Sequence, residues 1–353
     1  MIIVQLLPEL NEGGVERGAI DISRLLDKDG IKNYVISNGG KLEKELKNQI
    51  KFDVSSKNIF TFIPRIFKLR KILKDLNPDI VHVRSRVPAW LVFFAKKGLK
   101  FKVVSTVHGL NSVNFYSKIM INADKIIVPS NCVKEYILKN FHADKTKISV
   151  IFRGVDLSDF NPLNFDSEIL RTKFNLKKDD FIISCVGRIT NLKNIETIVK
   201  ALKFLPNAKL LVVGGVHKKR QKYFEFLKVL VCKLGLEKRV IFTGSISKIA
   251  EIYALSDVVV SASIKPESFG RSVAEAISLN TPVVASNHGG VKDIIIEGIN
   301  GYFFEPLDEQ ELADKILTAK ELKFDGFSYI KSKFSVEKMY NQTLEIYKEM
   351  LNE

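Results

Sequence analysis

The sequence contains little cysteine and no long hydrophobic run. Its 3 cysteines stand at positions 132, 185 and 232 without short spacing, which argues against a disulfide framework and against a cysteine-rich zinc site. The longest apolar run, Val87–Ala95, has about half of the ~20 residues that a membrane-spanning helix needs. The amino terminus has neither a basic n-region nor a small-residue cleavage site. We therefore expect a cytoplasmic protein.

Negative charge is also scarce. The chain has 40 Asp and Glu against 55 Lys and Arg, which gives a formal net charge of +15. Such a surplus favours anionic partners, whether nucleic acid, anionic lipid or a phosphorylated metabolite. A composition rich in Lys, Ile and Asn would produce the same surplus without any partner. Because no DNA or RNA recognition motif is present, we expect no nucleic acid partner.

The sequence does contain a regular alternation of short apolar segments and helical patterns. Its 353 residues correspond to two domains at about 150 residues each. Strands rich in Val and Ile that alternate with helices are typical of parallel sheets buried on both faces. The expected strands are Ile2–Leu7, Tyr34–Ser37, Asp79–Val83, Val103–Val107, Lys125–Val128, Phe181–Val186, Leu210–Val213, Val240–Phe242, Val258–Ser261 and Pro282–Ala285.

An aperiodic segment divides this alternation in two. Arg153–Phe165 carries Gly, Pro, Asp and Asn without a helical or strand period, so we expect a linker there. The fold class is therefore α/β, with one doubly wound domain over residues 1–163 and another over residues 164–334. A final amphipathic helix, 335–353, is expected to pack back on the first domain. Two such domains facing each other would form a cleft at the carboxyl ends of their strands, where ligands bind.

The loop after the first strand offers a candidate anion site. Gly13 and Gly14 precede a helix that starts near Val15, and glycines there permit a positive φ and let a ligand approach the backbone. The amino terminus of a helix presents unpaired N–H groups to an anion. The loop matches neither the dinucleotide-binding pattern G-x-G-x-x-G nor a P-loop. A plain strand–helix turn is the alternative interpretation.

Two basic residues follow the first strand of the second domain. Gly187 and Arg188 come directly after it, and Lys193 comes five residues after Arg188. A guanidinium and an ammonium at the carboxyl end of a strand could clamp a diphosphate. In so basic a chain they could equally be solvated surface charges.

The most specific segment is 266–276, PESFGRSVAEA. Glu267 lies in a loop after an expected strand, and Glu275 falls in the second turn of the helix that follows. A carboxylate in that turn could accept hydrogen bonds from two adjacent hydroxyls, as ribose presents them. Two glutamates at this spacing are common by chance, whereas Glu-Ser-Phe-Gly before a helix is rare. The backbone amides expected to face the ligand are those of Ser268, Phe269 and Gly270.

These motifs together carry a resemblance. They occur in the order found in the retaining glycosyltransferases of family 4, also called glycosyl transferases group 1, and they are similar to bacterial lipopolysaccharide-core enzymes of that family. One departure is Asn194, where the family usually has Gly. The matching positions are Gly13–Arg17, His108-Gly109, Arg188 with Lys193, Gly214-Gly215, Gly244, Pro266–Ala276 and Pro282–Val291.

The resemblance implies a GT-B fold of two Rossmann-like domains, with a nucleotide-sugar donor held mostly by the second. Arg188 and Lys193 would then neutralise the leaving diphosphate, and Glu275 would hold the ribose hydroxyls. Glu267 and the amides after it would hold the transferred sugar. Whether Glu267 acts as a nucleophile is left open.

The first domain would complete the donor site. By the same resemblance, His108 would contact the transferred sugar, and Gly14 would leave room near the phosphate and the acceptor. No D-x-D pair follows a strand in a likely donor position, so we expect no metal and no cofactor, with the cations of the protein acting in their place.

The sequence motifs that point to the acceptor are less specific than those that point to the donor. The segment 82–86, HVRSR, resembles one in glycosyltransferases of cell-envelope polysaccharides, and we assign Arg84, Arg86 and Gly13 to the acceptor side. Salt bridges at a domain edge are the alternative role for the two arginines.

The helical pattern over Phe60–Leu76 places apolar residues on one face and basic ones on the other, which suits either an anionic membrane surface or an ordinary core-facing helix.

The sequence thus favours a retaining, metal-independent glycosyltransferase that uses a nucleotide sugar. Its expected acceptor is a cell-envelope glycan or glycolipid, such as lipopolysaccharide core, on the cytoplasmic face of the inner membrane, where the protein would bind peripherally. The alternatives are another two-domain nucleotide-sugar enzyme, such as an epimerase or a phosphorylase, and a non-enzymatic polyanion-binding protein.

Overall fold

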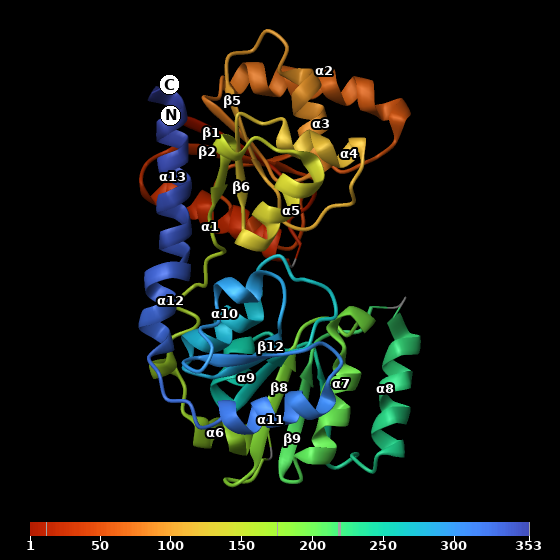
Figure 1. Cartoon of the computed structure of the whole chain (residues 1–353). Helices are drawn as coiled ribbons and strands as arrows, with labels where there is room; N and C mark the ends of the chain where they lie inside the picture. Colours follow the sequence, from red (N-terminus) through yellow and green to blue (C-terminus); the bar gives the residue numbers. More distant parts are fainter. Residues whose placement is uncertain (12, 175, 218–219, 353) are drawn as a thin grey trace. The chain divides into compact units, whose positions relative to one another are not determined.

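A computed structural model of the chain describes residues 1–352 apart from residues 12, 175 and 218–219. The chain forms two compact units (Figure 1). The first unit comprises Met1–Gly154 and Val336–Glu353, and the second comprises Val155–Ser335. The first unit therefore ends at Gly154, nine residues before the domain boundary predicted at residue 163. Gly154 lies inside the aperiodic segment expected to be a linker.

Within the described residues, the first unit is built on a seven-stranded parallel sheet in the order β3-β2-β1-β4-β5-β6-β7. The central strands are buried on both faces, which explains their near-continuous Val and Ile content. The strands are β1 (Ile2–Leu6), β2 (Lys32–Ser37), β3 (Gln49–Lys51), β4 (Ile80–Val83), β5 (Lys102–Thr106), β6 (Lys125–Val128) and β7 (Ile148–Val150). The helices are α1 (Gly14–Lys28), α2 (Ile59–Leu76), α3 (Arg86–Ala95), α4 (Phe115–Lys118), α5 (Asn131–Phe141) and α13 (Val336–Asn352).

The described part of the second unit contains a six-stranded parallel sheet in the order β10-β9-β8-β11-β12-β13. Its strands are β8 (Phe181–Val186), β9 (Ala208–Val213), β10 (Val240–Gly244), β11 (Val258–Ser261), β12 (Val283–Ser286) and β13 (Gly301–Phe304). Its helices are α6 (Ser167–Lys173), α7 (Ile195–Ala201), α8 (Gln221–Lys233), α9 (Ile249–Leu255), α10 (Arg271–Ser278), α11 (Glu309–Ala319) and α12 (Gly326–Phe334).

The prediction of two doubly wound α/β domains is confirmed, as are the ten expected strands to within two residues at either end. Three further strands, β3, β7 and β13, were not expected from the sequence. All three lie at sheet edges and are only three or four residues long, too short to show a period of their own. In each sheet the strand order reverses beside the first strand, at β1/β4 and at β8/β11, and ligands bind at such switch points.

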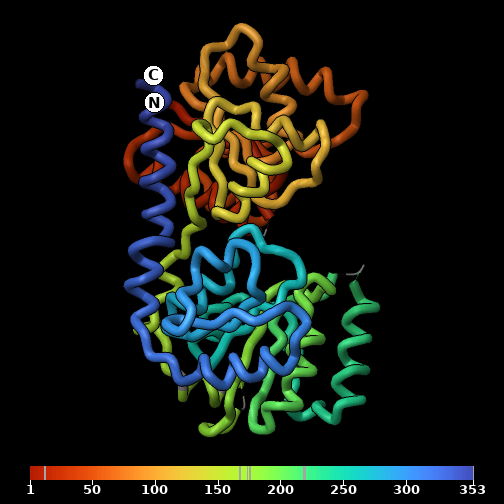
Figure 2. The backbone as a smooth tube through the Cα atoms, in the orientation of Figure 1, coloured from red at the N-terminus to blue at the C-terminus, as the bar shows by residue number. Residues whose placement is uncertain are grey.

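The carboxyl-terminal helix belongs to the first unit. The chain returns from the second unit and ends in α13, drawn in blue (Figure 2). Tyr347 and Met350 of this helix are buried in one apolar cluster with Ile3 of β1 and Leu26 of α1. None of the described helices combines the length and the apolar composition needed to cross a bilayer.

Candidate functional site

In the second unit, the candidate residues lie in loops that follow neighbouring strands. Gly187 and Arg188 follow β8, and Glu267 lies between β11 and α10. Because carboxyl ends of parallel strands meet at one edge of a sheet, these loops lie side by side. The amide of Ile264 donates a hydrogen bond of 2.9 Å to the carbonyl of Leu192, which ties the loop after β11 to the loop after β8.

An ion pair joins the two loops. Lys193 Nζ donates to Glu267 Oε1 over 2.5 Å, although the residues are 74 positions apart. Ser263 Oγ donates to the same oxygen over 2.5 Å. The side chains of Lys193 and Glu267 are 31% and 22% exposed. The ammonium has two further N–H donors, so it can hold Glu267 and still reach a ligand.

Two opposing effects act on the Glu267 carboxyl group. Burial raises the pKa of Glu267, but the charge and hydrogen bond of Lys193, the hydrogen bond of Ser263 and the nearby His288 lower it by more. Its pKa therefore lies below the usual value, and Glu267 is a carboxylate at neutral pH. The site thus presents an anchored negative charge directly beside a cation.

The Lys193 side chain lies against the Gly187–Arg188 turn. Lys193 Cε is 3.2 Å from the position that a Cβ would take at Gly187. Arg188 is exposed and has no ion-pair partner among the described residues. Asn194, which departs from the family pattern, has φ 50 in the left-handed region, a conformation that Asn tolerates better than other non-glycine residues. The turn that a glycine would form is thereby kept, and both cations remain at one loop.

Glu275 is buried near the start of α10, with 8% of its side chain exposed. Arg271 Nε donates to Glu275 Oε1 over 2.5 Å, and the Tyr253 hydroxyl donates to Oε2 over 3.1 Å. Burial, and then the charge of Glu275, raise the pKa of Tyr253 well above its usual value, so the phenol stays a donor. These two contacts fix the orientation of the carboxylate and leave one lone pair on each oxygen for a ligand.

The backbone between Glu267 and α10 is braced by the turn after β12. The amide of Gly290 donates to the carbonyl of Glu267 over 2.7 Å. Gly289 has φ 84, and a Cβ there would lie 2.7 Å from the Glu267 amide nitrogen, so a larger residue would push the two loops apart. The described residues contain no acceptor for the amides of Ser268, Phe269 and Gly270, which stay available, while the Phe269 ring packs against Phe334.

In the first unit, His108 follows β5 and lies beside Arg153. An Nη2 donor of Arg153 contacts His108 Nδ1. Because arginine only donates, Nδ1 must accept, and the proton of the neutral ring then lies on Nε2. Burial, followed by the charges of Arg153 and Arg84, keeps the pKa of His108 well below its usual value. Nε2 is buried without a partner in the described chain, so His108 offers one unused N–H donor.

Neither glycine of the first loop adopts the positive φ that glycine permits. Gly13 is extended at φ −178, and Gly14 is the first residue of α1 and is absent from the positive-φ glycines. Apart from its chain neighbours and its own helix backbone, none of the described residues places an atom within 4 Å of an ideal Cβ at Gly14. The amino terminus of α1 therefore forms without special glycine conformations.

The two acceptor-side arginines differ. Arg84 is 5% exposed and donates two hydrogen bonds, of 2.8 and 2.6 Å, to Gln5 Oε1. Arg86 is partly exposed, donates to Ser117 Oγ over 3.1 Å and lies 5.4 Å from the centre of the Tyr116 ring. In this conformation only Arg86 is accessible to a ligand.

Sequence reasoning missed four residues that hold the site together. Arg153 was assigned to a linker, and no local pattern marks it as a partner of His108. Tyr253 and Ser263 reach glutamates from other elements, so spacing carries no signal for them. Arg271 stands four residues before Glu275 on the same helix, and that i,i+4 spacing was a usable sign of the ion pair.

Family models match nearly the whole chain. The model described as Glycosyl transferases group 1 matches residues 166–327, and the model described as Glycosyltransferase Family 4 matches residues 12–159. Among curated relatives, a D-inositol 3-phosphate glycosyltransferase of Mycolicibacterium smegmatis is 31% identical over 257 residues, which are 67% of this chain and 58% of the relative. The chain thus spans less than two thirds of that relative's length.

Solved structures match over the full length. A glycosyltransferase from Rickettsia africae is 34% identical with a TM-score of 0.91, and the match covers 99% of this chain and 98% of that chain. The Anabaena protein HepE, solved with UDP and glucose, is 22% identical with a TM-score of 0.85, and the match covers 98% and 99%. The α/β fold of GT-B type that the resemblance implied is confirmed.

Proposed function

Because the chain belongs to the glycosyl transferases group 1 family, we propose that it transfers a sugar, with retention of configuration, from a nucleotide-activated donor to a cell-envelope glycan or glycolipid. The observation that carries the proposal is the loop pair after β8 and β11. There Lys193 pairs with an anchored carboxylate, Glu267, and Arg188 lies in the same loop as Lys193.

The leaving diphosphate is assigned to Arg188 and Lys193. As the bond to the sugar breaks, negative charge grows on the phosphate oxygen and positive charge grows on the sugar. Fixed cations at that oxygen stabilise the transition state more than the ground state. Lys193 is held in place by Glu267, while Arg188 has no such partner among the described residues and can turn towards the ligand.

The rest of the donor is assigned to groups with unused bonding capacity. Glu275 has a lone pair on each oxygen for the two ribose hydroxyls, and its orientation is fixed by Arg271 and Tyr253. Glu267 and the free amides that follow it are assigned to the transferred sugar. The Nε2–H of His108 is assigned to a sugar hydroxyl, since it is a buried donor without a partner in the described chain.

The reaction is proposed to need neither a metal nor a cofactor, because Arg188 and Lys193 supply the charge that a divalent ion would otherwise bring to the diphosphate. Activity measured with and without a strong chelator tests this part. An unchanged rate is expected, and complete inhibition that magnesium reverses would refute it.

The acceptor is proposed to be an envelope glycan or glycolipid such as lipopolysaccharide core, used at the cytoplasmic face of the membrane. Support comes from the HVRSR segment and from Arg86, whose guanidinium is accessible to an acidic sugar or phosphate. A smaller phosphorylated acceptor is the competing candidate, since the mycobacterial relative is named for D-inositol 3-phosphate. Transfer assays with both acceptor classes distinguish them.

The identity of the sugar donor is tested by measuring thermal unfolding of the protein in the presence of a panel of nucleotides and nucleotide sugars. A ligand at a hundred times its dissociation constant stabilises the folded state by about 2.7 kcal/mol. UDP-linked sugars come first in the panel, because HepE was solved with UDP and glucose. No stabilisation by any nucleotide sugar would reject the proposal, and conversion of the donor without any acceptor would favour an epimerase. Steeply salt-dependent DNA binding without turnover would favour a polyanion-binding protein.

A further inference from the structure

One surface of the first unit exposes an unusual number of large apolar side chains. We call it the aromatic face; it is formed by α2, α3 and the segment that leads into α4 (Figure 1). Phe60 is 87% exposed and Phe115 is 78% exposed. Soluble proteins rarely leave a contiguous apolar surface of this kind uncovered. Its exposed members are Ile59, Phe60, Ile63 and Phe67 of α2, Phe93 and Phe94 of α3, and Val113 and Phe115.

The aromatic face is continuous across its elements. The ring of Trp90 lies 5.9 Å from those of Phe93 and Phe94 and 5.4 Å from that of Phe115. Phe62 of α2 lies 6.0 Å from Phe94. These ring contacts link α2, α3 and α4 into one surface.

A groove of about 400 Å³ opens in this surface. Trp90, Phe94 and Val87 of α3 form one part of its lining, and side chains of α2, of α4 and of the two residues 56–57 before α2 form the rest. Lys57 and Ser56 are its polar lining residues. A slot lined by aromatic and aliphatic groups with a lysine among them suits a hydrocarbon chain that ends in a negatively charged headgroup. The remaining lining residues are Ile59, Phe62 and Tyr116.

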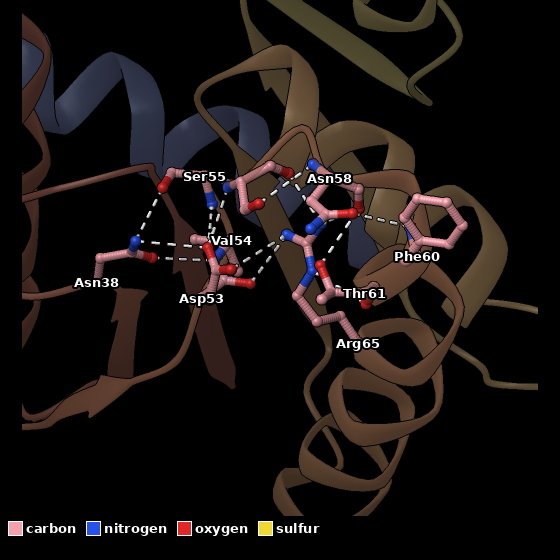
Figure 3. Close-up of polar contacts among 9 residues, drawn as sticks. Asn38, Asp53, Val54, Ser55, Asn58, Phe60, Thr61 and Arg65 are labelled. Carbon is pink, nitrogen blue, oxygen red and sulfur yellow. Dashed lines mark hydrogen bonds and ion pairs between the residues drawn. The ribbon is translucent and has the colours of Figure 1, made fainter.

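The start of α2 is held firmly although its apolar side chains are exposed (Figure 3). Asn58 caps the helix by accepting from the amide of Phe60 over 2.9 Å. Arg65, a basic residue of this helix, is only 5% exposed. Its guanidinium donates to the carbonyls of Asp53 and Ser56 over 3.3 and 2.8 Å. Phe60 is therefore presented on a fixed helix end and not on a loose segment.

Charge identifies what covers the aromatic face. Residues 56–118 contain thirteen Lys and Arg, of which Arg65 and Arg84 are buried, but only two Asp and no Glu, so most of the formal surplus of positive charge lies in this segment. The basic residues of α2, α3 and α4 include the exposed Lys68, Lys71 and Lys118. A second copy of the chain would bring two such surpluses together, whereas an anionic bilayer attracts them. Exposed aromatics within basic side chains are the composition of surfaces that enter a membrane interface.

We infer that the aromatic face docks on a bilayer of anionic phospholipid and that its groove takes one acyl chain. This inference goes beyond the transfer reaction, because it concerns lipid binding by the first unit alone and requires no donor. It would also bring a lipid-linked acceptor to the enzyme within the membrane plane.

The first experiment measures flotation of the full chain with vesicles of phosphatidylcholine alone and with equal parts of phosphatidylcholine and phosphatidylglycerol. We expect binding to the anionic vesicles and a loss of at least about tenfold for the double variant Phe60→Ser with Phe115→Ser. The matched control is Leu163→Ser, since Leu163 is 91% exposed in the second unit, and it should bind as the wild type does. Absence of wild-type binding, or equal binding by the double variant, would overturn the inference.

The second experiment uses Trp90, the sole tryptophan of the chain, as a reporter inside the groove. Vesicles carry lipids with a spin-label quencher either on the acyl chain or on the headgroup. Stronger quenching of Trp90 fluorescence by the acyl label is expected. Quenching only by the headgroup label would exclude chain insertion, and a stable dimer in sedimentation without lipid would show that a second copy covers the face. Both measurements are made without nucleotide sugar, so they stand or fall separately from the transfer reaction.

Discussion

Replacement of Lys193 by methionine separates the role of its charge from the role of its stem. Methionine keeps most of the apolar length of lysine, so packing against Gly187 is largely retained. What disappears is the ammonium that donates to Glu267 Oε1 over 2.5 Å. The variant therefore leaves Glu267 with the hydrogen bond of Ser263 and without its cation.

The expected loss in the free energy of unfolding follows from the exposure of the pair. Removing one partner of a fully buried ion pair costs about 3–5 kcal/mol. Because the two side chains are 31% and 22% exposed, solvent screens the remaining charge, and we expect about 1–3 kcal/mol. Loss of one fixed donor to a developing phosphate charge should also lower the transfer rate by about a hundredfold or more.

The stability effect should depend on pH in a defined direction. In the wild type the pKa of Glu267 is lowered on folding, so its contribution is present above the usual glutamate pKa of about 4.3 and is lost as the pH falls through the folded-state pKa. In the variant, burial remains while the Lys193 contribution is gone, so the folded-state pKa of Glu267 rises. The difference in stability between the two proteins should therefore be larger near pH ~7 than near pH ~4.

The assay is urea unfolding at both pH values, combined with titration calorimetry of the nucleotide. The decisive control is the double variant Lys193→Met with Glu267→Gln, which carries no unpaired carboxylate. It should recover most of the lost stability but neither nucleotide affinity nor transfer rate. If the double variant is no more stable than Lys193→Met alone, the ion pair is not the origin of the effect.

Three further predictions follow from the site. Glu275→Gln should weaken nucleotide binding at least about tenfold and cost about 1–3 kcal/mol of stability, because the amide oxygen can accept from only one of the two donors, Arg271 and Tyr253; equal affinity in calorimetry would contradict the ribose assignment. Gly289→Ala should cost about 1–3 kcal/mol and reduce nucleotide affinity, since φ is 84 and the new Cβ would meet the Glu267 backbone. Gly14→Ala is the matched variant that should leave the melting temperature unchanged or raise it, because beyond its chain neighbours and its own helix the described part of the chain has no atom within 4 Å of the new Cβ. Transfer should be insensitive to chelation, and a rate that requires added magnesium would refute the proposed role of the cations.

Several features follow from the sequence alone, since they depend on local composition. Val- and Ile-rich strands that alternate with helices bury their apolar side chains by pairing into parallel sheets that helices cover on both faces. Both sheets formed as expected. Parallel sheets in turn place every loop after a strand at one edge. That is why motifs far apart along the chain, such as those of Lys193 and Glu267, could be assigned to one place before any contact was known.

Tertiary structure alone decided which polar groups form hydrogen bonds within the protein and which remain available to a ligand. Arg65 and Arg84 resemble Arg86 and Arg188 in the sequence, yet the first two are buried because carbonyl and amide oxygens of other elements satisfy them. His108 has an unused donor only because Arg153, 45 residues away, occupies its other nitrogen. A sequence shows which groups can form hydrogen bonds, but a bond needs a partner within about 3 Å, and the folded chain alone sets that distance.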